Sequence, residues 1–583
     1  MKNWFNRKTA NFVLFIFACI LFANVSWGQT LYSERPYQPV VLRGGVLSSF
    51  FDVPVDSIYM YVYSDSAGSW SMIPFQIDER ILAEDPFKPG NESAYRHSYF
   101  IPDDGVLDVD DELVFLVGDL GDQAPAESWI DDAESRRFER LEIRLWDQDN
   151  PGIEAYGYLY RSSTITEPIP HPYDFSCDEE NDIVSTVNYQ VRMSKENGLI
   201  EDVILKPPLG SGVDIFDTQK IRFAGLFDFG TFPIVIGRGN SPAANEREQL
   251  YVYPDYYEHT THPVVRLVRE VRQTIRFGIP IDDLAFYVTT RYYPFSGNVA
   301  GGADLNPETL KEQFHTTEDI YIKLDLLRQS IDFNVNATGM KFYSRYNDNV
   351  IIDGVPDEVD KTIDIPIKEW SLVTGDQGSM FTQIEFEDTS WQSIELYFYD
   401  NSEGGQGDGT IVEGGDTGDR VSYGDEGILF RDLTQDSVNL TLGFQAYFLP
   451  ANLTRADGEK IASWLEKPLY VYTRAQSFLT SVSDDEYPNT TRGFELAQNY
   501  PNPFNGTTKI SFKLAQPSHV TLKIFNLSGQ LIKVLTDEKY GSGSHQILWD
   551  GKNQAGEIAA SGVYYYQITT GTGSQMKKMV FLQ

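Results

Sequence analysis

Short segments in which apolar and polar residues alternate recur along this chain of 583 residues. Leu141, Ile143 and Leu145, for example, are interleaved with charged residues. A period of two places the apolar side chains on one face of a strand. Gly, Pro, Asp and Asn clusters separate the segments, and the best helical candidate is Gly458–Glu466, with Asp457 as its expected cap. The pattern predicts an all-β multidomain protein and disfavours Rossmann and TIM-barrel folds.

The first 28 residues have the three parts of a secretory signal peptide. Basic residues precede an apolar run from Phe12 to Ala23, and a small-residue exit ends at Gly28. The run is too short for a stable bilayer span, which needs ~20 apolar residues. We therefore expect residues 1–28 to be removed during export. No later stretch is long and apolar enough to place the mature chain across a membrane.

The net charge limits the partners that the chain can bind, and the cysteine content limits the cross-links that it can form. The formal net charge of −38 would repel phosphate, so nucleic acid is excluded as an expected partner. Without residues 1–28, Cys177 is the single cysteine, and no internal disulfide can form. The exported protein must then depend on large cores or on bound metal. The acidic neighbours of Cys177 disfavour a reactive thiolate.

Changes in composition divide the mature chain into four segments. Residues 29–165 form a predicted N-terminal β module, which ends at a polar stretch with proline at every second position. Residues 166–480 are predicted to form a central β-sandwich body, and residues 481–493 a polar linker. Residues 494–583 carry eight Lys against five acidic residues, a net charge of +3 that contrasts with the acidic body. Some seven short strands separated by turns predict a small antiparallel sandwich there.

Four motifs in this last segment have a specific order. They are Asn499–Asn505 (Asn-Tyr-Pro-Asn-Pro-Phe-Asn), Ile524–Gln530, Trp549–Asn553 and Ser561–Tyr566. Together they resemble the type A C-terminal sorting domain of the bacterial type IX secretion system. That domain is similar to the immunoglobulin-like domain of flagellar hook-capping proteins.

The resemblance implies a route and a partner. The signal peptide would carry the chain across the inner membrane, and an outer-membrane translocon would then read residues 494–583. The protein would be released or attached to the outer-membrane surface. The alternative interpretation is an ordinary adhesive immunoglobulin-like module.

The N-terminal module contains two motifs, Ile73–Glu79 and Asp103–Phe115. They resemble a pair found in uncharacterised secreted bacterial β proteins, a resemblance that implies no activity. The second motif has six acidic side chains within ten residues around Gly105. Since Ca²⁺ takes 6–8 oxygen ligands, the candidate ligands are Asp104, Asp108 and Asp111.

The acidic turn of the second motif does not fit the best-known type of calcium site. Phe100 and Pro102 would occupy ligand positions of an EF-hand, so an EF-hand is excluded. A looser calcium loop and a solvated acidic turn both remain open. The acidic loops at 348–358 and 404–427 are weaker candidates of the same kind, and a long flexible connection is favoured for the latter.

Four arginines in Val264–Phe277 stand out from the acidic body. On a strand, Arg266, Arg272 and Arg276 share one face. With nearby tyrosines they could bind an acidic polysaccharide through bidentate contacts with its carboxylates. The alternative is cross-strand pairing with the protein's own carboxylates.

Catalytic motifs are not evident. The chain has no G-x-S-x-G elbow and no H-E-x-x-H, and His259 and His262 would face opposite sides of a strand. We therefore expect a non-enzymatic secreted or surface protein that binds glycans or the cell envelope. The alternative is a carbohydrate-active enzyme, a lyase or hydrolase with a groove near residues 256–293. Convergence of His259, His262, Arg266 and a tyrosine on one sheet face would favour that enzyme.

Overall fold

The computed structural model describes residues 30–581, apart from gaps at 85–94, 101–103, 148, 151, 196–197, 229–232, 237–251, 261–262, 277–279, 302–303, 306–320, 365–366, 387–390, 404–420, 434–437, 440–441, 479–493, 498, 500–501, 503, 515, 527–530, 555, 557, 560–561 and 571–572. The predicted signal peptide and linker lie outside the described residues.

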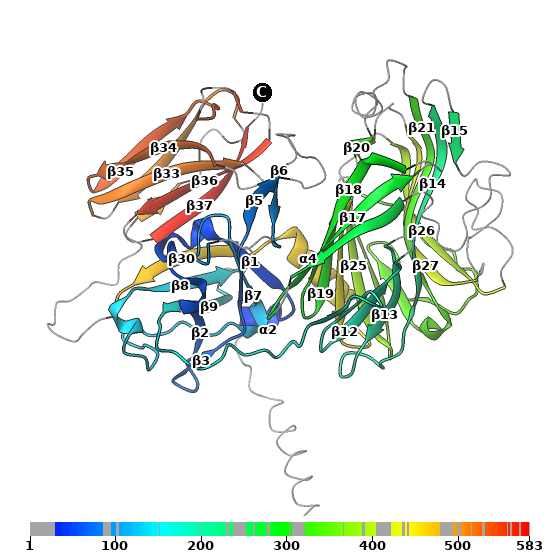
Figure 1. Ribbon diagram of the computed structural model, residues 1–583, viewed down its shortest axis with the longest axis horizontal. Coiled ribbons are helices and arrows are strands. Elements are labelled where there is room, and N and C mark those ends of the chain that lie inside the picture. The colour runs from blue at the N-terminus through cyan, green and yellow to red at the C-terminus, as the bar shows by residue number, and fades with distance from the viewer. Residues whose placement is uncertain are drawn as a thin grey trace, which may run out of the picture.

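Strands dominate the architecture, and the prediction of an all-β multidomain protein is confirmed. Figure 1 shows the N-terminal module and the C-terminal domain stacked on one side, with the central body beside them. No helix among the described residues is long and apolar enough to cross a membrane.

The N-terminal module packs two sheets against each other. One contains β1 (Pro39–Arg43), β7 (Glu112–Leu116) and β4 (Gln76–Asp78). The other contains β3 (Ser69–Met72), β2 (Ile58–Ser64), β9 (Glu154–Arg161), β8 (Arg140–Trp146) and β30 (Tyr470–Gln476). Alternate apolar residues of both sheets meet in one core, including Leu42, Met60, Leu113, Phe115 and Ile143. The first helix, α2 (Leu31–Glu34), adds Leu31 to this core, and β5 (Ile81–Glu84) pairs with β6 (Tyr95–Ser98).

The strand β30 joins this module from a distant part of the chain. It pairs antiparallel with β8, and Thr473 lies opposite Ile143. The sequence-based range 166–480 had placed this strand in the central body. The remaining domain limits stay predictions.

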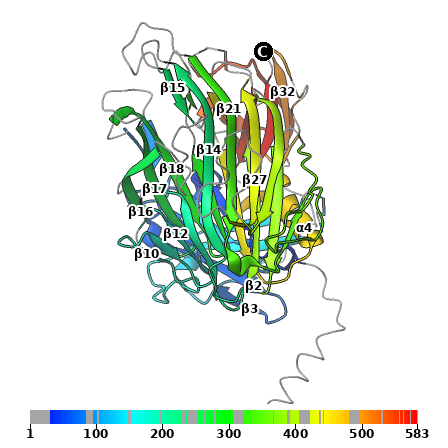
Figure 2. The same cartoon turned by 90° about the vertical axis from the view of Figure 1, so that its right-hand side faces the viewer.

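The central body is a sandwich of a five-stranded and a nine-stranded sheet (Figure 2). The smaller sheet has the order β15 (Pro233–Ile236), β14 (Phe216–Asp228), β21 (Tyr321–Phe333), β27 (Ser422–Leu433), β26 (Trp391–Asn401). The larger sheet has the order β16 (Val252–His259), β17 (Leu267–Arg276), β18 (Pro280–Tyr292), β19 (Ser296–Gly301), β29 (Leu442–Leu449), β25 (Gly378–Phe386), β24 (Ile367–Gly375), β22 (Lys341–Ser344), β23 (Val350–Ile351). Phe333 and Phe430 of the first share a core with Phe342, Val373 and Met380 of the second.

Two smaller sheets complete the body. One has the order β10 (Ser176–Asp178), β11 (Ile183–Ser185), β12 (Tyr189–Met193), β13 (Ile200–Leu205), and the other pairs β20 (Asp304–Leu305) with β28 (Val438–Asn439). Val184, Tyr189 and Val203 of the first extend the main core.

The helix α4 (Arg455–Glu466) covers part of the nine-stranded sheet. Its N-cap is Thr454, not the predicted Asp457, which is the third helical residue. Asp457 Oδ2 accepts a hydrogen bond from Thr454 N at 2.8 Å, while Thr454 accepts from Asp457 N. This reciprocal capping box explains the error, because an acidic third residue satisfies the same turn as a cap. Ile461 and Trp464 then pack in one cluster with Trp370.

Glu426 of β27 links the two sheets of the sandwich through polar contacts. The hydroxyls of Ser371 and Thr382 donate to its Oε1 at 2.8 and 3.3 Å. Burial raises the pKa of Glu426 to about 7, although these hydrogen bonds lower it. The folded protein therefore holds a proton here at pH values where an exposed Glu is ionised.

Replacing Glu426 with Gln is expected to raise the free energy of unfolding at about pH 8 by about 3–4 kcal/mol, since each unit of pKa difference is worth ~1.4 kcal/mol. Because the folded-state pKa is raised, the contribution of Glu426 is fully present below the unfolded value of ~4.3. It is lost as the pH rises through about 7. Denaturation at several pH values should therefore show a flatter profile for Glu426→Gln. The control is Glu385→Gln at an exposed pair with Lys368, and equal profiles for wild type and Glu426→Gln would contradict the assignment.

The described residues of the C-terminal segment form seven strands, as predicted. One sheet contains β31 (Phe494–Leu496), β32 (Thr508–Leu514) and β35 (Gly543–Trp549). The other contains β34 (Leu531–Tyr540), β33 (Ser518–Asn526), β36 (Gly562–Thr570) and β37 (Gly573–Phe581). The second sheet continues into the N-terminal module, because Ser574 of β37 pairs with Thr473 of β30. Gln567 Nε2 donates to Gly45 O at 3.0 Å across the same contact.

Candidate functional site

The motif Trp549–Asn553 builds one corner of the C-terminal domain. The Trp549 ring is fully buried, and its Nε1 donates to Lys552 O at 2.9 Å. Gly551 has φ +68°, and a Cβ there would lie 2.7 Å from the Phe581 ring. Both constraints select glycine. The motif therefore fixes a turn and places an aromatic ring in the core.

The other motifs meet the same core. Tyr566 Oη donates to Ala497 O and accepts from Asn499 N, both at 2.8 Å. Phe504 stacks on Phe581 with ring centroids 4.9 Å apart. Residues that are far apart in sequence thus hold the two sheets together.

The predicted arginine face has a different environment at each residue. Arg266 lies directly before β17 with its side chain buried. Its guanidinium pairs with Asp78, with Nε 2.9 Å from Oδ2, and with Glu112, with Nη2 2.7 Å from Oε2. Arg272 is also buried, at 8% exposure, and the side chain of Arg276 lies outside the described residues. Solvent ligands therefore do not reach Arg266.

The partners of Arg266 come from the N-terminal module, where the two motifs of that module pair as β4 and β7. Gln76 Oε1 accepts hydrogen bonds from three consecutive backbone amides, Val264 N, Val265 N and Arg266 N, at 2.8, 3.0 and 3.1 Å. Its Nε2 donates to Arg266 O at 2.9 Å. The first motif therefore binds the segment that enters β17.

Glu112 is shared between two cations and a phenol. Arg80 Nη1 lies 3.0 Å from its Oε1, and Tyr99 Oη lies 3.3 Å from its Oε2. Burial alone raises the pKa of Glu112, but Arg266 and Arg80 outweigh it and hold the pKa below its usual value. We call Gln76, Asp78, Arg80, Glu112 and Arg266 the Arg266 junction. It joins the N-terminal module to the central body.

The carboxylates of the acidic turn accept hydrogen bonds from backbone amides, mostly from the turn itself. Asp104 accepts from Val106 N at 3.0 Å, and Asp108 accepts from Asp110 N at 2.7 Å. Asp111 accepts from Arg80 N at 3.0 Å and from Asp108 N at 2.8 Å, and burial raises its pKa to about 6.

Across the described ranges, no three or more His, Cys, Asp or Glu side chains are grouped so that they could hold a metal ion. Asp104, Asp108 and Asp111 are not part of such a group among the described residues, and the calcium loop stays a prediction. The loop 348–358 is described, whereas 404–420 lies outside the described residues.

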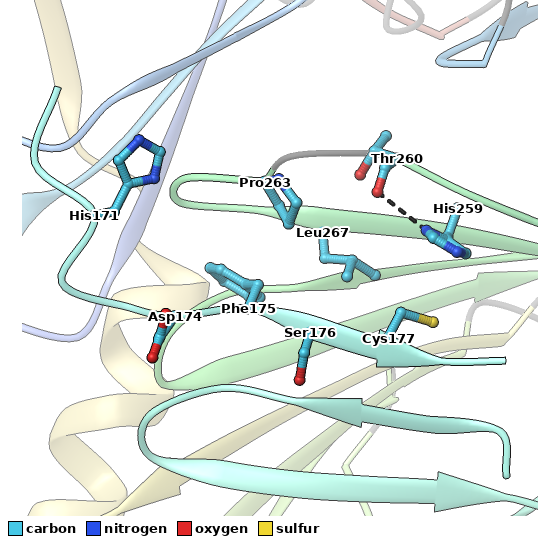
Figure 3. A pocket seen from close by; sticks show the side chains of 9 residues that line it. All are labelled: His171, Asp174, Phe175, Ser176, Cys177, His259, Thr260, Pro263 and Leu267. Carbon is cyan, nitrogen blue, oxygen red and sulfur yellow. Dashed lines mark hydrogen bonds between the residues drawn. The ribbon is translucent and has the colours of Figure 1, made fainter. Parts of the chain in front are cut away.

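A cavity of about 540 Å³ lies where Pro263 and Leu267 face the segment Phe175–Cys177 (Figure 3). Its lining residues are His171, Asp174, Phe175, Ser176, Cys177, His259, Thr260, Pro263 and Leu267. His259 Nε2 lies 2.9 Å from Glu179 Oε1, and its Nδ1 lies 3.1 Å from Thr260 O. Burial raises the pKa of the Cys177 thiol. This favours the neutral thiol over a nucleophilic thiolate.

The described residues do not bring together the groups expected for a lyase or hydrolase. Arg266 is held in its ion pairs, Tyr292 and Tyr293 are buried, and His259 contacts Glu179. His262 lies outside the described residues. Sequence reasoning missed Gln76, Asp78 and Arg80, whose roles become visible only once the two modules are in contact.

Comparison with known proteins identifies the C-terminal segment. The family described as the FlgD Ig-like domain matches residues 498–574. The chain is thus a multidomain β protein with an immunoglobulin-like domain at this end. No curated protein matches the chain.

The solved structures that match this chain have low sequence identity to it and low TM-scores. The Slr1438 protein from Synechocystis sp. PCC 6803 has 9% identity and a TM-score of 0.24, covering 49% of this chain and 99% of that one. Dimeric latent PorU from Porphyromonas gingivalis has 10% identity and a TM-score of 0.15, covering 62% of this chain and 34% of PorU. PorZ, a surface component of the type IX secretion system of that bacterium, has 11% identity and a TM-score of 0.12, covering 73% of this chain and 62% of PorZ. These scores are too low to support an argument about fold or function.

Proposed function

We propose that this protein is exported through the type IX secretion system and acts as a non-enzymatic β-rich protein in the medium or on the outer-membrane surface. The observation that carries the proposal is the C-terminal domain. Its motifs have the order of the type A sorting domain, and residues 498–574 match an immunoglobulin-like family. The signal peptide features of residues 1–28 supply the first step of the same route.

Glycan or cell-envelope binding by the central body is the second part of the proposal. Of the three predicted contacts we retain Arg276 on β17 as the candidate, because the side chain of Arg272 is buried. Arg266 belongs instead to the Arg266 junction. The cavity around His171 and His259 is the place where a lyase or hydrolase activity would be sought. Incubation with a panel of uronic-acid polysaccharides, followed by assays for unsaturated and reducing ends, tests that alternative.

A fusion experiment tests the export route directly. Residues 479–583 attached to a periplasmic reporter are expected to carry it to the medium or cell surface in a bacterium that has this secretion system. The matched control is the same fusion in a host without the translocon, where the reporter should stay periplasmic. Retention in both hosts, with the domain folded, would refute the sorting assignment.

A further inference from the structure

Three ionisable side chains meet on one face of the five-stranded sheet, away from the Arg266 junction. Lys220 lies on β14, Asp332 on β21 and Asp425 on β27, and β21 is the middle strand of the three. Lys220 is 1% exposed, and both aspartates are 0% exposed. Charged side chains are rarely buried to this extent.

The strand register explains why Lys220 meets Asp332. Lys220 lies opposite Ser330, and Thr218 lies opposite Asp332. Lys220 and Asp332 are therefore diagonal neighbours on the same face of an antiparallel pair. Lys220 Nζ is 2.7 Å from Asp332 Oδ2 and 3.9 Å from Asp425 Oδ2.

The second carboxylate oxygen of Asp332, Oδ1, also has a hydrogen-bond partner. Ser422 Oγ donates to Asp332 Oδ1 at 2.8 Å and accepts from Asp425 N at 3.0 Å. The carboxyl group is thus fixed between an amine and a hydroxyl. Such positioning supplies the large effective concentration that favours reaction between two side chains.

Asp425 adds a second acid to this water-excluded site. Neither of its carboxylate oxygens has a hydrogen-bond partner within the described structure. One ammonium and two carboxylates without water are costly, because desolvation opposes each charge. An amide between Lys220 and Asp332 would remove two of these charges.

We propose that Lys220 and Asp332 form an intramolecular isopeptide bond, with Asp425 as the proton-transfer group. A proton first passes from Lys220 Nζ to the Asp332 carboxylate, which gives a neutral amine and a neutral acid. The nitrogen lone pair then attacks Asp332 Cγ and forms the C–N bond, while the hydrogen bond from Ser422 supports the developing charge on Oδ1. Asp425 takes one of the two protons left on nitrogen and delivers it to the departing hydroxyl, so that the amide keeps one N–H. The C–O bond breaks, one water molecule leaves, and no oxidant or reductant is consumed.

This bond would give the exported protein a covalent staple that its single cysteine cannot supply. It would join β14 to β21 across 112 residues of chain. A cross-link of that kind constrains the unfolded chain and so favours the folded state.

Mass spectrometry of the purified full-length secreted protein tests the proposal. The denatured protein is expected to weigh less than its sequence by one water. Trypsin should fail to cut after Lys220, and a branched peptide should contain both Lys220 and Asp332. The internal control is Lys323 on β21, which is 48% exposed and 3.9 Å from Asp325. Trypsin should cut there, and no cross-link should form.

Two substitutions test the role of Lys220 in the bond and the role of Asp425 in proton transfer separately. Lys220→Arg and Asp425→Asn are each expected to show the full mass of their own sequence, with circular dichroism confirming the β fold. Water loss retained in a folded Asp425→Asn protein would overturn the role of Asp425. Cleavage after Lys220 in the wild type, with a separate unmodified peptide carrying Asp332, would overturn the bond itself, and this readout needs no variant to fold.

Discussion

Replacing Arg266 with Met is expected to lower the free energy of unfolding by about 3–5 kcal/mol, because it leaves Asp78 and Glu112 buried without their shared cation. Chemical denaturation of wild type and variant measures the loss. The matched control is Arg431→Met, which removes a pair with Glu395 on the five-stranded sheet whose side chains are 24% and 29% exposed, and should cost only about 0–1 kcal/mol. The Arg266 variant should also become sensitive to proteases where the two modules meet.

Two further substitutions make this test more specific. Adding Asp78→Asn and Glu112→Gln to Arg266→Met should recover part of the loss, since the uncompensated charges are removed. If Arg266 instead served glycan recognition, Arg266→Met would reduce binding to uronic-acid polymers and leave the denaturation midpoint unchanged. That pair of results would reject the structural role of the Arg266 junction.

Deleting residues 494–583 is expected to trap the body in the periplasm and to abolish its appearance in the medium. The outer-membrane translocon would lose the domain that it recognises, whereas the signal peptide would still act at the inner membrane. Cell fractionation and immunoblotting measure the distribution.

A domain swap serves as the control for this deletion. Exchange of residues 494–583 for an unrelated immunoglobulin-like domain should trap the protein equally, which separates recognition of this sequence from a general need for a folded terminus. Normal amounts of the truncated protein in the medium would contradict the assignment.

The alternation of apolar and polar residues, which is a local property of the sequence, was enough to predict that the protein consists mainly of strands. In the strand Thr508–Leu514, for example, apolar and polar residues alternate and every second residue is buried. The motif Trp549–Asn553 was found in the sequence, and the structure shows that it forms a turn in which Gly551 has a left-handed backbone. The N-cap of α4 was misplaced because Thr454 and Asp457 share one capping box.

Contacts between distant segments could not be predicted from these signals. The sequence placed Arg266 on a strand face, but its partners Asp78 and Glu112 lie 188 and 154 residues away. Lys220 and Asp332 were not singled out among 47 basic and 85 acidic residues, because only the register of β14 and β21 brings them together. In each case the missing information was which strands become neighbours.

The position of β30 sets an order of events during synthesis. Arg140 of β8 donates to Gln476 of β30 at 2.7 Å, although 336 residues of chain separate them. The first module to leave the ribosome therefore lacks a strand of its sheet until nearly all of the central body has followed it. A nascent or interrupted chain that stops before residue 470 would present β8 as an open edge, a template for pairing with other chains. The N-terminal module thus closes only after the central body has been made, shortly before the C-terminal domain emerges.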